Sequence, residues 1–379
     1  MLSKEEIARY NRHLLLPEIG MEGQQKLKQA KVLVIGAGGL GCPALSYLCA
    51  AGAGKIGIVD FDGVDESNLQ RQILYSTADI GKSKAIVAAE KLQLQNPHIT
   101  IIPYQLKLDN NNALAIISEY DFVIDGTDNF ATRYLVNDAC LLLNKPLVYG
   151  SVYRFEGQVT VFNYTDERGN KGPTYRCLFP KPPAPETAPN CSQIGVLGIL
   201  PGIIGSIQAC EAIKLITGVG ELLSGKLLLF NALSMSFQTM EFLRDETVLR
   251  NSPQNKEAFL SFNYDYFCNN TSSTTINTVT ANELIKWMHE KQPLQLLDVR
   301  EKDELPAIPA LNDLHIPLGE IKEHADKIAR DKKTIVFCRS GMRSKIAIGI
   351  LANDFGFTNL YNLEGGAEEW MQQTELLKT

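Results

Sequence analysis

Short apolar runs alternate with helical patterns over the N-terminal part of the chain. The run KVLVI at residues 31–35 enters a glycine-rich turn and a helical pattern, and the next run, KIGIVD, ends at Asp60. The order strand, helix, strand predicts a βαβ unit. Further runs at ITIIPY, DFVID and PLVYG, separated by helical stretches, extend this unit into a doubly wound parallel sheet. Two later runs, GQVTVFNY and KLLLFNALSMSFQTMEFL, predict antiparallel strands added to that sheet.

A second set of alternating elements begins at Thr278. Helices are predicted at TANELIKWMHEK, near EIKEHADKIA and at SKIAIGILANDF, and strands at LQLLDVR, TIVFC and NLYNL. About 100 residues of this kind predict a small α/β domain. We therefore divide the chain into a first domain at residues 1–245, a linker at 246–275 that includes the polar run CNNTSSTT, and a second domain at 276–379. Six prolines between residues 166 and 190 predict a long exposed loop.

The composition agrees with two globular domains. The chain has 379 residues, of which 45% are hydrophobic and 21% charged. A net charge of -6 gives no reason to expect nucleic acid or an anionic membrane as a partner. The charged N-terminus has no secretory pattern, and Pro201 breaks the most apolar stretch, so we expect a cytoplasmic protein that does not span a membrane.

A glycine-rich turn is the first candidate for binding chemistry. Gly36, Gly38, Gly39 and Gly41 follow a predicted strand and open a helix, where backbone amides and the helix N-terminus can approach phosphates. Asp60 ends the next strand, where it can bind ribose hydroxyls. These features predict a Rossmann-like nucleotide site. They fit an ATP enzyme and a NAD-dependent oxidoreductase equally.

Two cations and a carboxylate favour ATP. Arg71, within SNLQRQ, and Lys84, within GKSK, can balance the charge of a triphosphate. Asp128 follows the strand DFVID at the carboxyl edge of the sheet, where one carboxylate can hold Mg²⁺ on phosphates. We add Asn129, the last residue of DGTDN, to the nucleotide site.

The first domain resembles the MoeB/ThiF group of ubiquitin-activating-type adenylyltransferases. The matching motifs are RYNRHLLLPEIG, GAGGLGC, DFDGVDESNLQRQ, GKSKA, DGTDN, YRCLFP and CSQIGVLG. The resemblance implies that ATP activates the C-terminal Gly-Gly carboxylate of a small ubiquitin-like sulfur-carrier protein as an acyl adenylate. It also implies a homodimer in which Arg12 reaches the triphosphate of the other subunit. The implied ATP-binding residues are Gly39, Asp60, Asn68, Arg71, Lys84 and Asp128.

The same resemblance bears on two cysteines. Cys191 matches a family cysteine that takes the acyl group as a thioester or exchanges an acyl disulfide. Family members commonly bind zinc through two CxxC pairs, but here the first pair is reduced to Thr174 and Cys177, and RDETVLRNSPQNKE has no cysteine. A four-cysteine site cannot be assembled from these residues, so we predict no zinc and a packed Cys177 thiol.

The second domain carries a cysteine loop between a predicted strand and a helix. Backbone amides and the helix N-terminus should converge on the cysteine sulfur and, with two arginines, stabilise a thiolate or persulfide. With LDVRE, HIPLGEI and LEGG, this loop resembles a rhodanese domain, in which Cys338 would carry a persulfide received from an upstream donor. Related phosphatases have one more residue in the loop, and an inert module is the other alternative. The persulfide loop is Cys338, Arg339, Ser340, Gly341, Met342 and Arg343.

Together these patterns predict an adenylyltransferase fused to a rhodanese-like sulfurtransferase domain, as in molybdopterin-synthase sulfurylases. The alternatives are an adenylyltransferase with a non-catalytic rhodanese module and a NAD-dependent oxidoreductase. The oxidoreductase explains neither SNLQRQ nor the second domain. The pathway served, whether molybdenum cofactor (molybdopterin), thiamine or tRNA thiolation, stays open.

Overall fold

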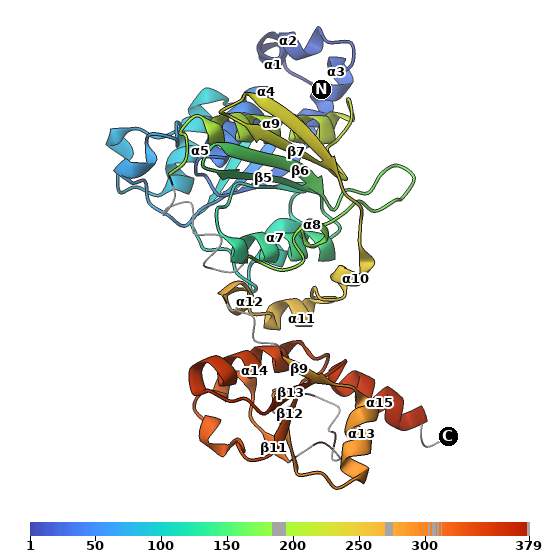
Figure 1. Cartoon of the computed structure of the whole chain (residues 1–379). Helices are drawn as coiled ribbons and strands as arrows, with labels where there is room; N and C mark the ends of the chain where they lie inside the picture. Colours follow the sequence, from blue (N-terminus) through green and yellow to red (C-terminus); the bar gives the residue numbers. More distant parts are fainter. Residues whose placement is uncertain are drawn as a thin grey trace. The chain divides into compact units, whose positions relative to one another are not determined.

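The computed structural model describes residues 1–183, 195–269, 276–301, 304, 308, 311 and 313–376. Two compact units make up the chain, Met1–Tyr264 and Asp265–Thr379. Figure 1 shows a sheet flanked by helices in each unit.

The first unit is built on an eight-stranded sheet in the order β3-β2-β1-β4-β5-β6-β7-β8. The first five strands in this order pair in parallel and the last four pair antiparallel. The predicted doubly wound sheet with added antiparallel strands is therefore confirmed. The strands are β1 (Lys31–Ile35), β2 (Lys55–Val59), β3 (Thr100–Tyr104), β4 (Phe122–Asp125), β5 (Leu147–Tyr153), β6 (Glu156–Phe162), β7 (Lys226–Asn231) and β8 (Ser236–Glu241).

The helices of the first unit pack beside this sheet or on other helices (Figure 1). They are α1 (Lys4–Arg9), α2 (Asn11–Leu14), α3 (Gly20–Gln29), α4 (Gly41–Ala51), α5 (Lys84–Gln95), α6 (Ala113–Ser118), α7 (Phe130–Leu142), α8 (Tyr175–Leu178), α9 (Leu200–Thr217), α10 (Glu246–Leu249) and α11 (Lys256–Ser261). The short helix α12 (Tyr264–Asn269) follows them. Helices α4, α5, α7 and α9 are among those that pack beside the sheet.

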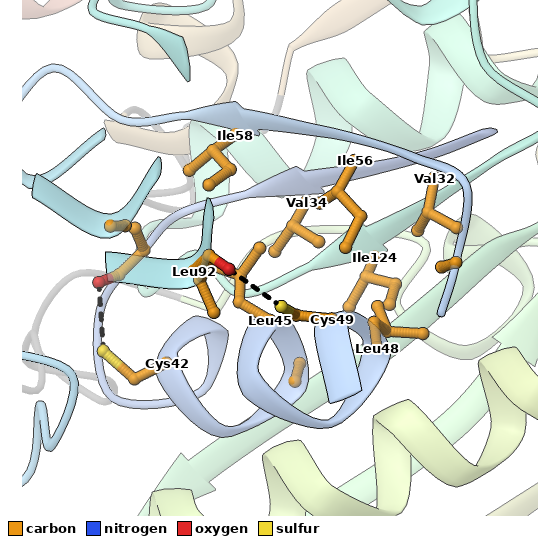
Figure 2. Close-up of a cluster of buried hydrophobic side chains, with 14 of the residues drawn as sticks. Val32, Val34, Cys42, Leu45, Leu48, Cys49, Ile56, Ile58, Leu92 and Ile124 are labelled. Carbon is orange, nitrogen blue, oxygen red and sulfur yellow. Dashed lines mark hydrogen bonds between the residues drawn. The ribbon is translucent and has the colours of Figure 1, made fainter. Parts of the chain in front are cut away.

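The core between α4 and the sheet is apolar and closed. Figure 2 shows Leu45 and Leu48 of α4 beside Val34 and Ile56 of the central strands, all fully buried. Cys49 belongs to this core: its thiol donates to the Leu92 carbonyl at 3.2 Å, and burial raises the pKa of Cys49 to about 11. This thiol therefore stays protonated and serves packing.

Register brings three strand ends to one edge of the sheet. Ile35, the last residue of β1, pairs with Val59 on one side and with Asp125 on the other. The turns that follow β1, β2 and β4 consequently start side by side. The sheet order changes direction between β1 and β4, which is where ligands bind in open α/β sheets.

The second unit has a five-stranded parallel sheet in the order β11-β10-β12-β13-β9. Its strands are β9 (Asn277–Val279), β10 (Leu294–Asp298), β11 (Leu314–His315), β12 (Lys333–Phe337) and β13 (Leu360–Leu363), and its helices are α13 (Ala281–His289), α14 (Met342–Phe355) and α15 (Gly366–Leu376). The predicted small α/β domain is confirmed.

One predicted helix of this unit is wrong. The segment near EIKEHADKIA forms two 3₁₀ turns, Leu318–Glu320 and Ala325–Lys327, instead of an α-helix. The apolar side chains Ile321, Ala325 and Ile328 are still buried in the core. The spacing of these apolar residues shows that one side of the segment is buried. Successive 3₁₀ turns can bury residues at this spacing as well as an α-helix can.

The segment after β8 is folded onto the first unit. Asp138 of α7 accepts hydrogen bonds from Arg176 at 2.8 and 2.6 Å and from the Tyr264 hydroxyl at 3.0 Å, with all three residues buried. Breaking a buried pair of this kind leaves an uncompensated charge, so these bonds anchor residues up to Tyr264. Within the predicted linker, α10 and α11 are regular helices of this unit.

Candidate functional site

The glycine turn after β1 is shaped by close backbone approach. Gly36 has φ +89°, and a Cβ there would lie 2.8 Å from the Gly126 carbonyl oxygen. A Cβ on Gly41 would lie 1.9 Å from the Gly36 carbonyl oxygen. Only glycine fits these two positions, because the turns after β1 and β4 and the start of α4 touch through their backbones. The phosphate-binding turn predicted from the sequence thus has the required close packing.

Asp60 braces this turn from the end of β2. Its Oδ2 accepts the Ala37 N–H at 2.8 Å and its Oδ1 accepts the Asp62 N–H at 2.8 Å. Burial raises the pKa of Asp60. The carboxylate therefore fixes the glycine turn as well as lining the cleft beside it.

A cleft opens over the carboxyl ends of β1, β2 and β4. Arg133, Gln72, Thr127 and Lys107 also line it, beside most of the residues predicted from the sequence. Those predicted residues are Gly36, Gly38, Gly39, Asp60, Arg71, Lys84, Asp128 and Asn129.

Three of the described residues that the sequence predicted for the nucleotide site do not line this cleft. Gly41 allows the close backbone packing at the start of α4. Asn68 lies next to the cleft lining, because its backbone carbonyl accepts the N–H of the lining residue Gln72 at 2.9 Å. Arg12 is an exposed residue of α2. Cys191 lies outside the described residues.

The cleft holds two of the predicted cations. The Lys84 ammonium lies 3.2 Å from the Asp62 carboxylate, with a Lys84 side chain that is only 7% exposed. One nitrogen of Arg71 donates to the Ser67 carbonyl at 2.9 Å, which leaves its remaining guanidinium N–H groups for other acceptors. Both side chains are held in place and can meet a phosphate anion.

The two residues that follow Thr127 have different environments. The Asn129 side chain accepts the Thr132 N–H at 2.9 Å and caps α7, so its carbonyl oxygen has a structural task. The Asp128 carboxylate is exposed in the cleft and has no hydrogen bond or ion pair to the described residues. A carboxylate with open coordination in this cleft fits Mg²⁺, which prefers one or two carboxylates together with phosphate oxygens and water.

Asp125 and Arg133 hold the loop of Asp128, and sequence analysis missed Arg133. Arg133 donates to the Thr127 carbonyl at 2.9 Å and lies over the rings of Phe130 and Tyr149. Asp125 is fully buried and accepts the N–H and the hydroxyl of Thr127 at 2.9 and 2.6 Å. Burial raises the pKa of Asp125. The signal was present in the sequence as a lone arginine in the apolar helix that follows DGTDN.

The second predicted site lies where β12 ends and α14 begins. Cys338 is buried, and its carbonyl accepts the Ala367 N–H at 2.8 Å. A Cβ on Gly366 would lie 2.4 Å from that carbonyl oxygen, which explains why the second glycine of LEGG begins α15. The Ser344 hydroxyl lies 3.6 Å from the Cys338 sulfur and 2.6 Å from Asn362 Oδ1. Gly341, with φ +88°, is the N-cap of α14.

The loop arginines have acidic partners that the sequence analysis did not foresee. Arg343 makes two hydrogen bonds to Glu304, at 2.7 and 2.6 Å. Arg339 donates to Glu368 at 2.7 Å. Ser340 lies on the exposed side of the loop, and Met342 is the first residue of α14.

Cys177 is the one cysteine left at the position where family members have the first CxxC pair. Its sulfur accepts the N–H groups of Thr174 and Asp245, each at 3.4 Å. Hydrogen bonds to one sulfur therefore join α8 to the segment before α10. In the described part of the chain, no group of three or more His, Cys, Asp or Glu residues could hold a metal ion.

The fold and the two sites define a two-domain protein with a nucleotide-type cleft and a rhodanese-type cysteine loop. Comparison with known proteins agrees. The chain belongs to the ThiF family, whose model matches residues 10–249, and it carries a rhodanese-like domain matched at residues 280–373. The resemblance proposed from the motifs is thereby confirmed.

Relatives with both parts cover nearly the whole chain. It is 44% identical to a protein of Mycobacterium tuberculosis named probable adenylyltransferase/sulfurtransferase MoeZ, over 99% of this chain and 95% of MoeZ. It is 39% identical to adenylyltransferase and sulfurtransferase MOCS3 of Xenopus laevis, over 99% of this chain and 88% of that protein. The sulfur carrier protein adenylyltransferase of Thermus thermophilus is 49% identical over 70% of this chain and 98% of its own length.

Solved structures support the fold of the first unit. The structure of E. coli MccB with ATP is 22% identical, with a TM-score of 0.54 over 64% of this chain and 73% of MccB. This similarity concerns the fold alone. Among the residues that the structure describes, no helix has the length and apolar character to cross a membrane.

Proposed function

We propose that this enzyme uses ATP to adenylylate the C-terminal Gly-Gly carboxylate of a small ubiquitin-like sulfur-carrier protein and then delivers sulfur from a persulfide on Cys338. The observation that carries the first activity is the cleft at the sheet edge, where Arg71, Lys84 and the open Asp128 carboxylate meet the glycine turn. The family assignment favours this function over the NAD-dependent oxidoreductase.

In the first step, a carrier carboxylate oxygen attacks the α-phosphorus of ATP and pyrophosphate leaves. The glycine turn and the N-terminus of α4 hold phosphate oxygens through backbone N–H groups. Arg71 and Lys84 stabilise the charge that moves onto the leaving pyrophosphate. Asp128 would hold Mg²⁺, which neutralises phosphate charge when it is bound. No general base is needed, because the carboxylate is already ionised and the site acts by positioning.

In the second step, the terminal sulfur of the Cys338 persulfide attacks the acyl carbon, and AMP leaves with the bonding electrons. The product is an acyl disulfide on Cys338. A thiolate then attacks the Cys338 sulfur and releases the carrier thiocarboxylate, leaving a disulfide on the enzyme. We assign that thiolate to Cys191; the alternative role for Cys191 is an acyl thioester formed directly from the adenylate.

The proposal includes several features of the whole protein. A homodimer would bring Arg12 of one subunit to the triphosphate of the other, which agrees with the exposure of Arg12 and its absence from the cleft of its own subunit. We further propose a cytoplasmic enzyme without zinc that receives sulfur from an upstream persulfide donor.

ATP–pyrophosphate exchange tests the first activity. Exchange should require ATP, Mg²⁺ and a carrier that ends in Gly-Gly, and a carrier lacking the last glycine should give none. Asp128→Asn should lower the exchange rate about a hundredfold, because a charge-stabilising contact of the transition state is lost. The control Glu90→Gln, at an exposed position of α5, should leave the rate unchanged. Full exchange by Asp128→Asn would contradict the role of Asp128, and no exchange with any Gly-Gly carrier would contradict the activity.

A further inference from the structure

Arg343 of the persulfide loop is neutralised by a carboxylate from a distant part of the second unit. Both terminal nitrogens of its guanidinium donate to Glu304, at 2.7 and 2.6 Å. The two side chains are only 16% and 20% exposed. A bidentate pair with so little solvent is geometrically fixed and weakly screened.

Both members of this pair are ionised at neutral pH. Burial opposes the charged form of Glu304, but the hydrogen bond and charge of Arg343 outweigh it and lower the pKa of Glu304. Burial likewise opposes the charge of Arg343, while Glu304 and the neighbouring Cys338 raise the pKa of Arg343. The guanidinium therefore interacts electrostatically with the cysteine, but its charge is already balanced.

The other loop arginine is also paired. Arg339 donates to Glu368 at 2.7 Å, although this pair is about half exposed. Because solvent screens the Arg339–Glu368 pair, its interaction energy is smaller than that of the Arg343–Glu304 pair. Neither arginine of the loop thus offers an uncompensated positive charge to an incoming anion. This differs from the nucleotide cleft, where phosphate binding needs such charges.

We infer that Glu304 is a specificity-determining residue of the sulfur-loading step: by occupying Arg343 it selects the persulfide of a thiol over a dianionic sulfane donor such as thiosulfate. A dianion approaching Cys338 meets a neutral pair and loses the stabilisation that a free guanidinium would give. A thiol persulfide carries at most one negative charge on the reacting group, so it loses little stabilisation when Arg343 is already paired. The inference rests on the proposed role of Cys338 as persulfide carrier.

The loading reaction is a thiol–disulfide type exchange with no net oxidation. The Cys338 thiolate attacks the outer sulfur of a donor R–S–SH, the S–S bond of the donor breaks, and RS⁻ leaves with the bonding pair. Cys338 then carries S–SH, and the proton stays on the transferred sulfur. With thiosulfate, the same attack on the outer sulfur releases sulfite.

The test compares two donors on the full-length protein. Thiosulfate and cysteine persulfide are each supplied in excess, and intact-mass spectra follow the gain of one sulfur atom with time. Glu304→Gln should raise the initial rate with thiosulfate about tenfold, because a charge-assisted contact becomes available, and should change the rate with cysteine persulfide less than twofold. Glu304→Ala serves as a second neutral variant, and thermal melts establish that each variant is folded.

Three further variants make the result decisive. Glu323→Gln removes one negative charge at an exposed position of the same unit and should change neither rate. Glu304→Gln combined with Arg343→Gln should return thiosulfate loading to the wild-type rate, since Glu304 acts through Arg343. Cys338→Ser should gain no sulfur from either donor.

If Cys338→Ser loads like the wild type, the proposed function fails. If loading depends on Cys338 but neither Glu304 variant changes the ratio of the two rates, the inference about Glu304 is overturned.

Discussion

The nucleotide cleft and the persulfide loop both follow a parallel strand and precede a helix, but they differ in how many of their charged groups already have a partner. In the cleft, Lys84 is paired with Asp62 and Arg71 donates only to a backbone carbonyl, and the Asp128 carboxylate has no hydrogen bond or ion pair to the described residues. The loop presents arginines that are each paired with a glutamate. A charged group of the cleft is therefore left to interact with a ligand or metal ion, whereas both arginines of the loop already have partners. In the proposed function, similar backbone geometry thus serves a polyanion in one unit and a sulfur atom in the other.

The largest expected effect is in the cleft. Lys84→Met removes a nearly buried cation that lines the cleft and should slow ATP–pyrophosphate exchange by about 10²- to 10³-fold, as for the loss of other charge-stabilising donors. Lys82→Met removes the same charge at an exposed position two residues away and should have little effect. Equal rates for the two variants would mean that exchange does not depend on the cation at position 84.

A smaller effect, on stability, tests the backbone contact beneath the cleft. Gly41→Ala places a Cβ 1.9 Å from the Gly36 carbonyl and should lower the free energy of unfolding by about 2 kcal/mol or more. At Gly38 the nearest atom to an added Cβ is Gln72 Nε2, at 3.5 Å, so Gly38→Ala should cost less than about 0.5 kcal/mol. Chemical denaturation of both variants measures the difference. Equal denaturation midpoints for the two variants would show that the backbone of the turn can shift to make room for the added methyl group.

The smallest effect concerns the loop and depends on pH. The pKa of Glu304 is lower in the folded protein than its unfolded value of about 4.3, so its stabilisation is fully present above that pH and is lost as the pH falls through the folded pKa. Wild type should therefore exceed Glu304→Gln in stability at pH 7, and the difference should shrink below about pH 4. Thermal melts of the second unit across this range provide the measurement. A difference independent of pH would mean that Glu304 is not ionised in the pair.

Local features of the first site could be predicted because they depend on short stretches of sequence. The glycines after KVLVI need no distant partner to be recognised, since a strand, a tight turn and a helix follow one another within a few residues. Asp60 and Asp128 lie at the predicted edge of the sheet because the parallel strands before them end there. The helix predicted near EIKEHADKIA failed because the apolar spacing reports burial and does not distinguish an α-helix from successive 3₁₀ turns.

The sequence by itself determined the class of fold, the two chemical motifs and the kinds of residue in each site, because strand and helix periods and turn chemistry are local properties. Only the tertiary structure decided which charges remain available. Glu304 lies 39 residues from Arg343, and Asp138 meets Tyr264 across 126 residues. Such pairs form where separate elements pack, and no pattern along the chain encodes their geometry. Whether an arginine can bind an anion is therefore settled by its partner in space.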